Sequence, residues 1–206
     1  MKLKLIQQGA EAKIFLDSSK NLIIKDRTSK SYRHPNLDNQ IRKKRTKSET
    51  KLLKKASEVI DCPIPTNTTN IYQIPMPFIN GKKLSENFNN FALKEQKEIC
   101  REIGGSIAKL HKKNIIHGDL TTSNMILVED KIFFIDFGLG YISSKTENKA
   151  VDLHLLKHAL EAKHFMRWKI LFEEISKSYK KILGKTESEK IFERMTAIEK
   201  RGRYRH

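Results

Sequence analysis

The feature that most constrains the fold is a pair of short apolar runs, residues 125–128 and 132–135, separated by Glu129-Asp130-Lys131. Apolar runs of this length on either side of a polar turn predict a β-hairpin. The residues just outside the two strands then meet at one end of the hairpin. Here those residues are Asn124 and Asp136, and Asp119 stands five positions before Asn124. The pattern therefore predicts three oxygen-bearing side chains around one end of a hairpin, unless these residues serve only as turn formers.

This arrangement matches the chemistry of phosphoryl transfer from a nucleoside triphosphate. That reaction needs oxygen ligands for Mg²⁺ and a carboxylate beside the attacking group. Asp119 and Asn124 have the spacing of the H-x-D-x-x-x-x-N catalytic loop of kinases, and Asp136-Phe137-Gly138 follows the second run as the metal-binding D-F-G does. We expect Asp119 to be catalytic, and Asn124 and Asp136 to bind Mg²⁺.

The N-terminal region predicts three short strands, at residues 1–8, 12–16 and 21–25. Lys25 closes the third strand, and a lysine in that setting is costly to leave unpaired, so its partner should be a phosphate or a carboxylate. An edge lysine in water is the alternative. Between the first two strands only Gly9 is a glycine, so Gly9, Ala10 and Glu11 would cover the phosphates thinly, through backbone N–H groups.

A long helix is predicted over residues 37–59, with Asp38 as its N-cap. Glu49 lies near its middle, one turn before Leu52 and Leu53 on the apolar side. We expect Glu49 to hold Lys25. The alternative is a surface pair with Arg45, four residues earlier, which would stabilise the helix by only tenths of a kcal/mol.

Residues 71–74 predict another strand, and residues 75–81, with two prolines, predict a stiff linker between two lobes. In a kinase-like hinge, Met76 would guard the nucleotide pocket, Pro77 would offer its carbonyl to the adenine of ATP, and Ile79 would offer its N–H. Proline is tolerable at a position that supplies only a carbonyl. An ordinary linker would mark the same boundary, with one lobe at 1–79 and the next at 80–199.

The second half of the chain is mostly helical in pattern. Helices are expected at residues 84–88 and 93–113, from 151 to about 163, and at 165–183 and 187–200, with a polar stretch at 143–149. Gly104-Gly105 marks a place where another element can approach closely.

Charge is the strongest bulk property: 41 Lys and Arg against 24 Asp and Glu give a net charge of +17. Basic residues cluster at 42–47 and in a flexible tail at 200–206. We expect both clusters to contact nucleic acid, a solvated basic face being the alternative. No run approaches the roughly 18 apolar residues of a membrane span, and the two cysteines, Cys62 and Cys100, fit a reducing cytoplasmic setting without disulfides.

Several motifs together resemble one family. They are Gly9-Ala10-Glu11-Ala12, Ile24-Lys25, Arg42-x-x-Arg45-Thr46-x-x-Glu49, His117-Gly118-Asp119-Leu120-Thr121-Thr122-Ser123-Asn124, Asp136-Phe137-Gly138-Leu139-Gly140, Lys149-Ala150-Val151-Asp152-Leu153 and Arg201-Gly202-Arg203-Tyr204-Arg205. This set, spread over essentially the whole chain, looks like the PRPK-type atypical kinases, the kinase-like ATPase subunits of KEOPS complexes.

The resemblance implies an α+β, two-lobed protein-kinase-like fold, with a small β-rich N-lobe carrying one main helix, a mostly helical C-lobe and a truncated activation segment. It implies Mg²⁺-dependent ATP hydrolysis that supports threonylcarbamoyladenosine modification of tRNA, with slow autophosphorylation on serine as a side activity. Partners would be the threonylcarbamoyl transferase subunit, a small adaptor subunit on the N-lobe, and tRNA. By position, Lys25 would hold the α and β phosphates, and Asp152 would support the catalytic loop.

Departures from ordinary protein kinases are informative as well. Gly118 replaces the arginine of H-R-D, Thr121 stands where a lysine is common, and no A-P-E follows Gly138 before Asp152. A peptide-docking platform is thus missing, which favours ATP hydrolysis over efficient protein phosphorylation. A minimal RIO-like serine/threonine kinase and a non-hydrolytic tRNA-binding scaffold remain the alternatives, the latter disfavoured by the complete set of Lys25, Asp119, Asn124 and Asp136.

Overall fold

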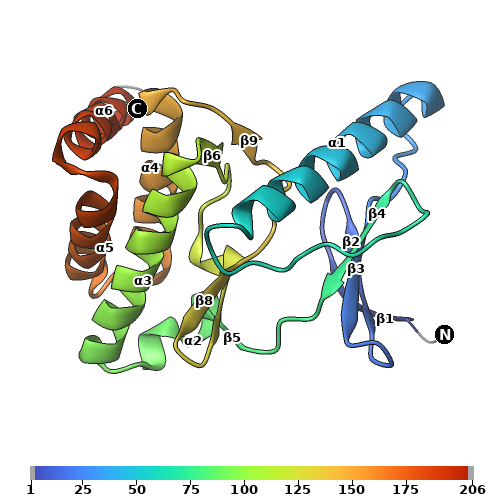
Figure 1. Ribbon diagram of the computed structural model, residues 1–206, viewed down its shortest axis with the longest axis horizontal. Helices are drawn as coiled ribbons and strands as arrows, with labels where there is room; N and C mark the ends of the chain where they lie inside the picture. Colours follow the sequence, from blue (N-terminus) through green and yellow to red (C-terminus); the bar gives the residue numbers. More distant parts are fainter. Residues whose placement is uncertain (1–2, 204–206) are drawn as a thin grey trace.

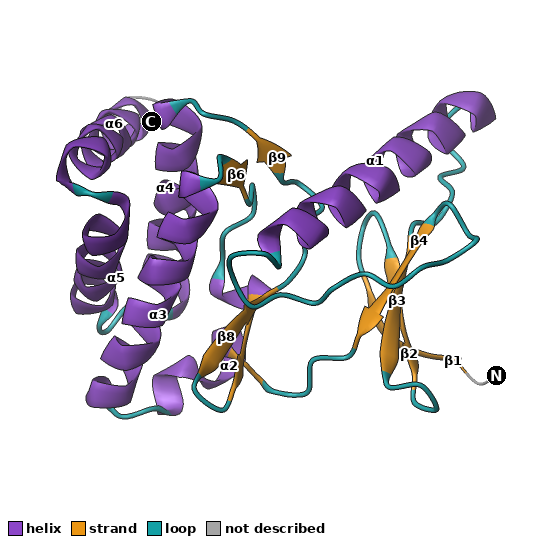
Figure 2. Cartoon of the chain, in the orientation of Figure 1, coloured by secondary structure: helices purple, strands orange, loops and turns teal. Residues whose placement is uncertain are grey.

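The computed structural model describes residues 3–203 and has two lobes (Figure 1). The N-lobe is an antiparallel sheet with one long helix, and the C-lobe is mostly helical with short strands between its helices (Figure 2). The predicted α+β, kinase-like arrangement is confirmed.

The N-lobe sheet contains β1 (Leu3–Gln8), β2 (Lys13–Asp17), β3 (Leu22–Asp26) and β4 (Gln73–Pro77), paired antiparallel in that order. Lys13 pairs with Asp26 in the register of β2 and β3, so the turn at residues 9–12 lies at the end of the sheet where Lys25 also lies. The three N-terminal strands were predicted within one or two residues of these limits.

Strand β4 corrects the expected linker, because it continues through both prolines. Pro75 and Pro77 stand opposite Ile24 and Leu22, and Phe78 N–H donates to Asn21 carbonyl at 3.0 Å. Hydrogen-bonded and non-hydrogen-bonded positions alternate along an antiparallel pair, so the backbone nitrogens of both prolines point away from β3. No N–H is needed on that side. Pro75 carbonyl accepts from Thr66 N–H at 2.8 Å on that outer side. Proline therefore marks an edge strand here, and not a linker.

Helix α1 (Pro35–Ala56) runs beside the sheet, and its C-terminal turns reach the C-lobe (Figure 1). It begins at Pro35, a residue well suited to the first helical position. The prediction that Asp38 is the N-cap was wrong. Asp38 lies within the first turn, where its buried carboxylate accepts from Arg42 Nε at 2.7 Å and lies 3.6 Å from Arg33.

The C-lobe is built on α3 (Leu93–Lys112) and α5 (Trp168–Leu183), which pack tightly against each other. A Cβ added at Gly104 would lie 2.2 Å from the carbonyl oxygen of Ile175, so only glycine allows this approach. The close contact predicted at Gly104-Gly105 is therefore present. The remaining elements are β5 (Lys82–Lys83), α2 (Leu84–Asn87), a 3₁₀ turn (Phe88–Asn90), β6 (Ile115–Ile116), a 3₁₀ turn (Thr122–Asn124), β7 (Met125–Val128), β8 (Lys131–Phe134), β9 (Tyr141–Ile142), α4 (Thr146–Lys163) and α6 (Lys185–Arg203).

Two boundaries in the C-lobe differ from the prediction. Helix α4 begins at Thr146, five residues before the predicted start and inside the polar stretch, where Glu147 pairs with Arg194 and Lys149 with Glu187, both on α6. Helix α6 continues through Arg203, so residues 200–203 of the expected flexible tail are helical, and residues 204–206 lie outside the described part. Polar composition alone therefore did not locate the start of α4 or the end of α6.

Within the described residues, no helix is long and apolar enough to cross a membrane.

Candidate active site

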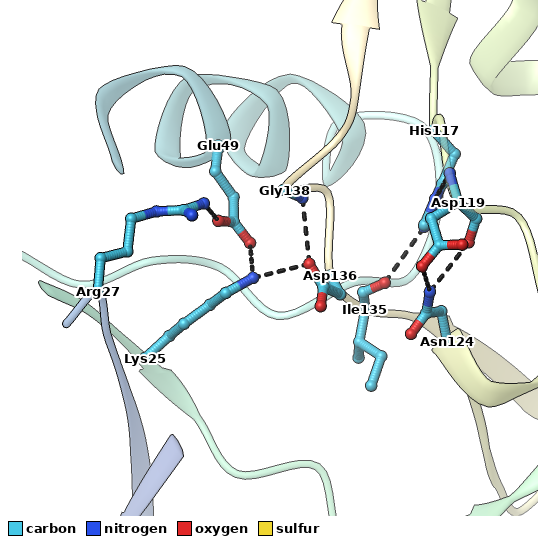
Figure 3. Close-up of polar contacts among 9 residues, drawn as sticks. All are labelled: Lys25, Arg27, Glu49, His117, Asp119, Asn124, Ile135, Asp136 and Gly138. Carbon is cyan, nitrogen blue, oxygen red and sulfur yellow. Dashed lines mark hydrogen bonds and ion pairs between the residues drawn. The ribbon is translucent and has the colours of Figure 1, made fainter. Parts of the chain in front are cut away.

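The site is built on the hairpin that the sequence predicts. Strands β7 and β8 pair antiparallel, with Met125 opposite Phe134, and Ile135 N–H donates to Asn124 carbonyl at 3.0 Å. Asn124 and Asp136 consequently lie at the same end of the hairpin, with Asp119 beside Asn124 (Figure 3). This grouping was predicted correctly.

Asp119 and Asn124 form a direct pair. Asn124 Nδ2 donates to both the backbone carbonyl and the Oδ2 atom of Asp119, each at 2.9 Å. With its amide nitrogen held in this way, Asn124 keeps its Oδ1 oxygen for another ligand. The pair therefore fixes the Asp119 carboxylate and presents an amide oxygen.

Asp152, on α4, holds the start of the candidate catalytic loop, residues 117–124. Its fully buried carboxylate accepts from the backbone N–H of His117 at 2.7 Å and of Gly118 at 2.8 Å. It thus accepts hydrogen bonds from one buried and one partly buried N–H group, and a buried N–H is costly to leave unpaired. The supporting role that the resemblance implies for Asp152 agrees with these contacts.

His117 joins the catalytic loop to the segment that follows the hairpin. Its Nε2 lies 3.2 Å from Ile135 carbonyl, and its ring packs against Phe137 with centroids 4.5 Å apart. Burial lowers the pKa of His117 although nearby carboxylates act to raise it. A neutral ring that donates to Ile135 fits this position.

Gly118 has no room for a side chain. Its φ is +80°, and an added Cβ would lie 2.3 Å from Leu139 carbonyl oxygen. We expect Gly118→Ala to lower the free energy of unfolding by at least about 1–2 kcal/mol, from the backbone conformation alone. Thermal unfolding measures this change. Gly9→Ala is the matched control, because the nearest atom to its added Cβ is 3.6 Å away; equal stability of the two variants would contradict the steric account.

Lys25 lies between two carboxylates. Its Nζ donates to Glu49 Oε1 at 2.6 Å and to Asp136 Oδ1 at 2.7 Å (Figure 3). The predicted contact with Glu49 is present, and the alternatives of an exposed edge lysine and of a surface pair between Glu49 and Arg45 were wrong. These contacts connect the sheet, α1 and the hairpin at one ammonium group.

Asp136 is held in an unusual conformation for a non-glycine residue, with φ at +61°. Its Oδ1 also accepts from Gly138 N–H at 3.1 Å. Burial acts to raise the pKa of Asp136, but Lys25 and the Gly138 N–H outweigh it and lower that pKa. The carboxylate is therefore ionised at neutral pH, as a metal ligand must be.

Arg27 is a buried member of this cluster that the sequence reasoning missed. Its Nη2 lies 2.5 Å from Glu49 Oε2, so Glu49 holds one cation on each oxygen. A Cβ added at Gly138 would lie 3.4 Å from both Lys25 Nζ and Arg27 Nη2, so both cations face the same segment. The available signal was a spacing of two residues: Arg27 directly follows β3, and an extended backbone that continues past the strand places Lys25 and Arg27 on one face.

The expected nucleotide-binding residues lie in two places. Gly9 and Ala10 form the exposed β1–β2 turn, closed by Gly9 N–H donating to Ala12 carbonyl at 2.9 Å. The Glu11 carboxylate contacts Arg33 at 3.3 Å and Arg45 at 2.7 Å. The hinge candidates are on and after β4: Met76 is buried, Pro77 carbonyl faces away from β3, and Ile79 is half-buried two residues beyond.

Comparison with known proteins agrees with this geometry. A model of the RIO domain matches residues 10–154, a span that contains Lys25, Glu49, Asp119, Asn124 and Asp136. The chain belongs to the RIO domain family.

Several similar proteins carry KEOPS names. It is 44% identical over 214 residues to "KEOPS complex subunit Bud32" of Pyrococcus abyssi, covering 98% of this chain and 97% of that protein. It is 41% identical over 213 residues to "EKC/KEOPS complex subunit BUD32" of Enterocytozoon bieneusi, covering 98% of each. A "probable bifunctional tRNA threonylcarbamoyladenosine biosynthesis protein" of Methanobrevibacter smithii is 41% identical over 206 residues, but this chain spans only 37% of its length. The predicted resemblance to PRPK-type kinase-like subunits is confirmed.

Proposed function

We propose that the protein is the kinase-like ATPase of a KEOPS complex, which hydrolyses ATP with Mg²⁺ in support of threonylcarbamoyladenosine modification of tRNA in the cytoplasm. The single observation that carries the catalytic part is the line of contacts from Glu49 through Lys25 to Asp136, beside the Asp119–Asn124 pair. A scaffold that only binds RNA would not need this complete set.

The residues fit a magnesium ion by their chemistry. Asn124 Oδ1 and the ionised carboxylate of Asp136 are hard oxygen donors, which Mg²⁺ prefers, and substrate phosphates and water complete its coordination in such sites. When bound, Mg²⁺ supplies charge neutralisation to the phosphates. Lys25 would hold the α and β phosphates, and Glu49 would keep its ammonium aimed at them.

Asp119 is the proposed catalytic carboxylate. The Asn124 amide holds its Oδ2, so the carboxylate keeps one orientation beside the proposed metal ligands. From there it would orient the attacking water by accepting its hydrogen bond. Positioning of this kind is the principal contribution that a protein makes to phosphoryl transfer.

The adenine would be held at β4. Pro77 carbonyl on the outer edge would accept from the amino group, and Ile79 N–H would donate to the ring, with Met76 buried behind them. Gly9, Ala10 and the backbone of Glu11 would lie over the phosphates. The proposed boundary between the two lobes lies between residues 79 and 80, directly after this segment.

The partners are proposed from the names of the relatives. One is called a KEOPS complex subunit and another a bifunctional threonylcarbamoyladenosine biosynthesis protein that contains a region similar to this chain. We propose that the threonylcarbamoyl transferase subunit binds this protein and that a small adaptor subunit binds the N-lobe. We also propose that tRNA contacts the basic residues of α1 and those at positions 200–206 of the sequence.

The test uses γ-labelled ATP with the purified chain, with and without tRNA and the transferase subunit. We expect label in free phosphate, at a rate that rises when the partners are added. Label retained on a protein serine with little free phosphate would identify a protein kinase instead. No turnover of ATP under any of these conditions would contradict the proposal.

The exposed lysines of α1 offer a separate test of RNA binding. Lys43, Lys44 and Lys47 are exposed on this helix. We expect their combined substitution by alanine to weaken tRNA binding and to flatten the salt dependence of log K by up to about 0.9 for each phosphate that is no longer neutralised. The same change at Lys94, Lys112 and Lys113, exposed lysines at α3, is the matched control. Equal effects of the two triple variants would leave only nonspecific attraction by net charge.

A further inference from the structure

Glu11 lies in the turn proposed to cover the phosphates, but its side chain contacts α1 and the segment before it. Its Oε2 lies 2.7 Å from Arg45 Nη1 on α1, and its Oε1 lies 3.3 Å from Arg33 Nη2. Burial acts to raise the pKa of Glu11, but Arg45 and Arg33 together lower it. The carboxylate is therefore charged and occupied by two arginines.

Helix α1 thereby contacts two parts of the proposed phosphate site. Arg45 and Glu49 are four residues apart and share one face of the helix. Arg45 contacts Glu11 of the β1–β2 turn, and Glu49 contacts Lys25 of β3. A shift of α1 along its axis would therefore move the contacts of the turn and of Lys25 together.

The second arginine at Glu11 is itself fixed to the start of α1. Arg33 lies 3.6 Å from the buried carboxylate of Asp38, which also accepts from Arg42 Nε. Arg42 in turn donates to the backbone carbonyl of Arg27 at 3.3 Å. Arg33 is thus held in place by contacts that extend to Arg27, the residue directly after β3.

We propose that Glu11 is a positioning residue: its ion pairs with Arg45 and Arg33 hold the turn at residues 9–12 in register with α1, in place of a full glycine-rich loop. It acts on bound nucleotide through the backbone of this turn, and its carboxylate does not contact the phosphates. This inference rests on the proposed function, since it assigns the turn to the phosphates of ATP.

The exposure of the Glu11–Arg45 pair explains why we assign it a role in positioning the turn and not in stabilising the fold. The side chains of Glu11 and Arg45 are 42% and 40% exposed, so water screens the pair and it contributes little to the stability of the fold. The backbone it holds is short and, except for Gly9, has no glycine. Its effect should therefore appear in binding of the phosphate groups and in motion of the turn.

The experiment compares Glu11→Gln, Arg45→Gln and the double variant. We expect each single variant to raise the Kd for Mg-ATP by about two- to fivefold, the loss expected for one exposed ion pair. The Kd for adenosine should not change, because adenosine has no phosphates. We expect the double variant to bind no more weakly than Glu11→Gln alone, since the two residues act as one unit. Glu58→Gln, an exposed glutamate just beyond α1, is the control for the change in charge.

Three results would overturn the inference. Additive effects in the double variant, or no effect of Arg45→Gln, would mean that Glu11 acts on nucleotide directly. Equal losses for ATP and adenosine would mean general damage to the N-lobe.

A readout without nucleotide separates this inference from the proposed function. Amide hydrogen exchange of residues 9–12 should become faster in both single variants, and unchanged exchange would contradict the positioning role. If the unsubstituted protein bound no ATP, the proposed function would fail, while the exchange measurement would still decide whether Glu11 holds the turn.

Discussion

Asp136→Asn should lower the rate of ATP hydrolysis by at least about 10²-fold, the scale on which removal of one group that stabilises charge in a transition state acts. The substitution keeps the shape of the side chain but removes the negative charge that Lys25 contacts and that is proposed to bind Mg²⁺. The side chain is half-exposed, and Glu49 still holds Lys25, so the fold should persist. Phosphate release at saturating ATP, with and without the transferase subunit, measures the effect.

The matched control for this prediction is Asp130→Asn. Asp130 is exposed in the turn at the opposite end of the same hairpin, so it undergoes the same chemical change away from the site. Hydrolysis by Asp130→Asn should equal that of the unsubstituted protein. If Asp136→Asn hydrolysed ATP within about threefold of that control, Asp136 would not be a ligand on which turnover depends.

The parts of the site that could be predicted are those in which local pattern and chemistry agree. Short apolar runs on either side of a polar turn favour a hairpin. The proximity of Asn124 and Asp136 therefore followed from their positions just outside the two runs. Lys25 at the end of an apolar strand is costly to leave without a negatively charged partner. Glu49 was the carboxylate on the apolar side of the next helix. Both predictions depended on strong signals at individual residues: a turn between two apolar runs, and a lysine that needs a carboxylate partner.

The parts that could not be predicted depend on contacts that the local sequence pattern does not reveal. Aspartate is a residue type favoured at N-caps. Asp38 instead lies within the first turn of α1, where it contacts Arg33 and Arg42. Two closely spaced prolines, Pro75 and Pro77, suggest a linker. They fit a strand only at the edge of a sheet, and the sequence alone does not show that β4 is an edge strand. The pairing of Glu11 with Arg45 is likewise invisible to periodicity, since neither residue belongs to an apolar face.

Arg27 was missed for a different reason. A carboxylate has two oxygens, and the prediction assigned Glu49 a single partner. Once β3 is a strand, Lys25 and Arg27 share a face, and one buried glutamate can hold both cations. The cluster of Lys25, Arg27, Glu49 and Asp136 then contains two positive and two negative charges. Neutrality of the whole cluster is the condition under which such burial is tolerated.

Removing Glu49 breaks that balance, and we expect Glu49→Gln to lower the free energy of unfolding by about 3–5 kcal/mol, the range for loss of one partner of a buried ion pair. Glu49 is 2% exposed and Arg27 is 3% exposed. Water therefore cannot replace the Glu49 carboxylate as the partner of the Arg27 guanidinium. For a chain of this size, each kcal/mol corresponds to a fall of about 2–4 °C in Tm. Thermal and denaturant unfolding measure the loss, and Glu58→Gln, exposed just past the end of α1, should leave stability unchanged.

A second substitution tests whether the loss comes from an unpaired cation. Adding Arg27→Met to Glu49→Gln removes the charge left without a partner, so the double variant should recover part of the stability that Glu49→Gln removes. Losses that simply add would mean that packing, and not charge, dominates at this position. ATP hydrolysis should stay low in the double variant even where stability returns, because Lys25 would still lack the carboxylate that aims it at the phosphates. Recovery of stability without recovery of turnover would therefore separate the structural role of Glu49 from its proposed role in the reaction.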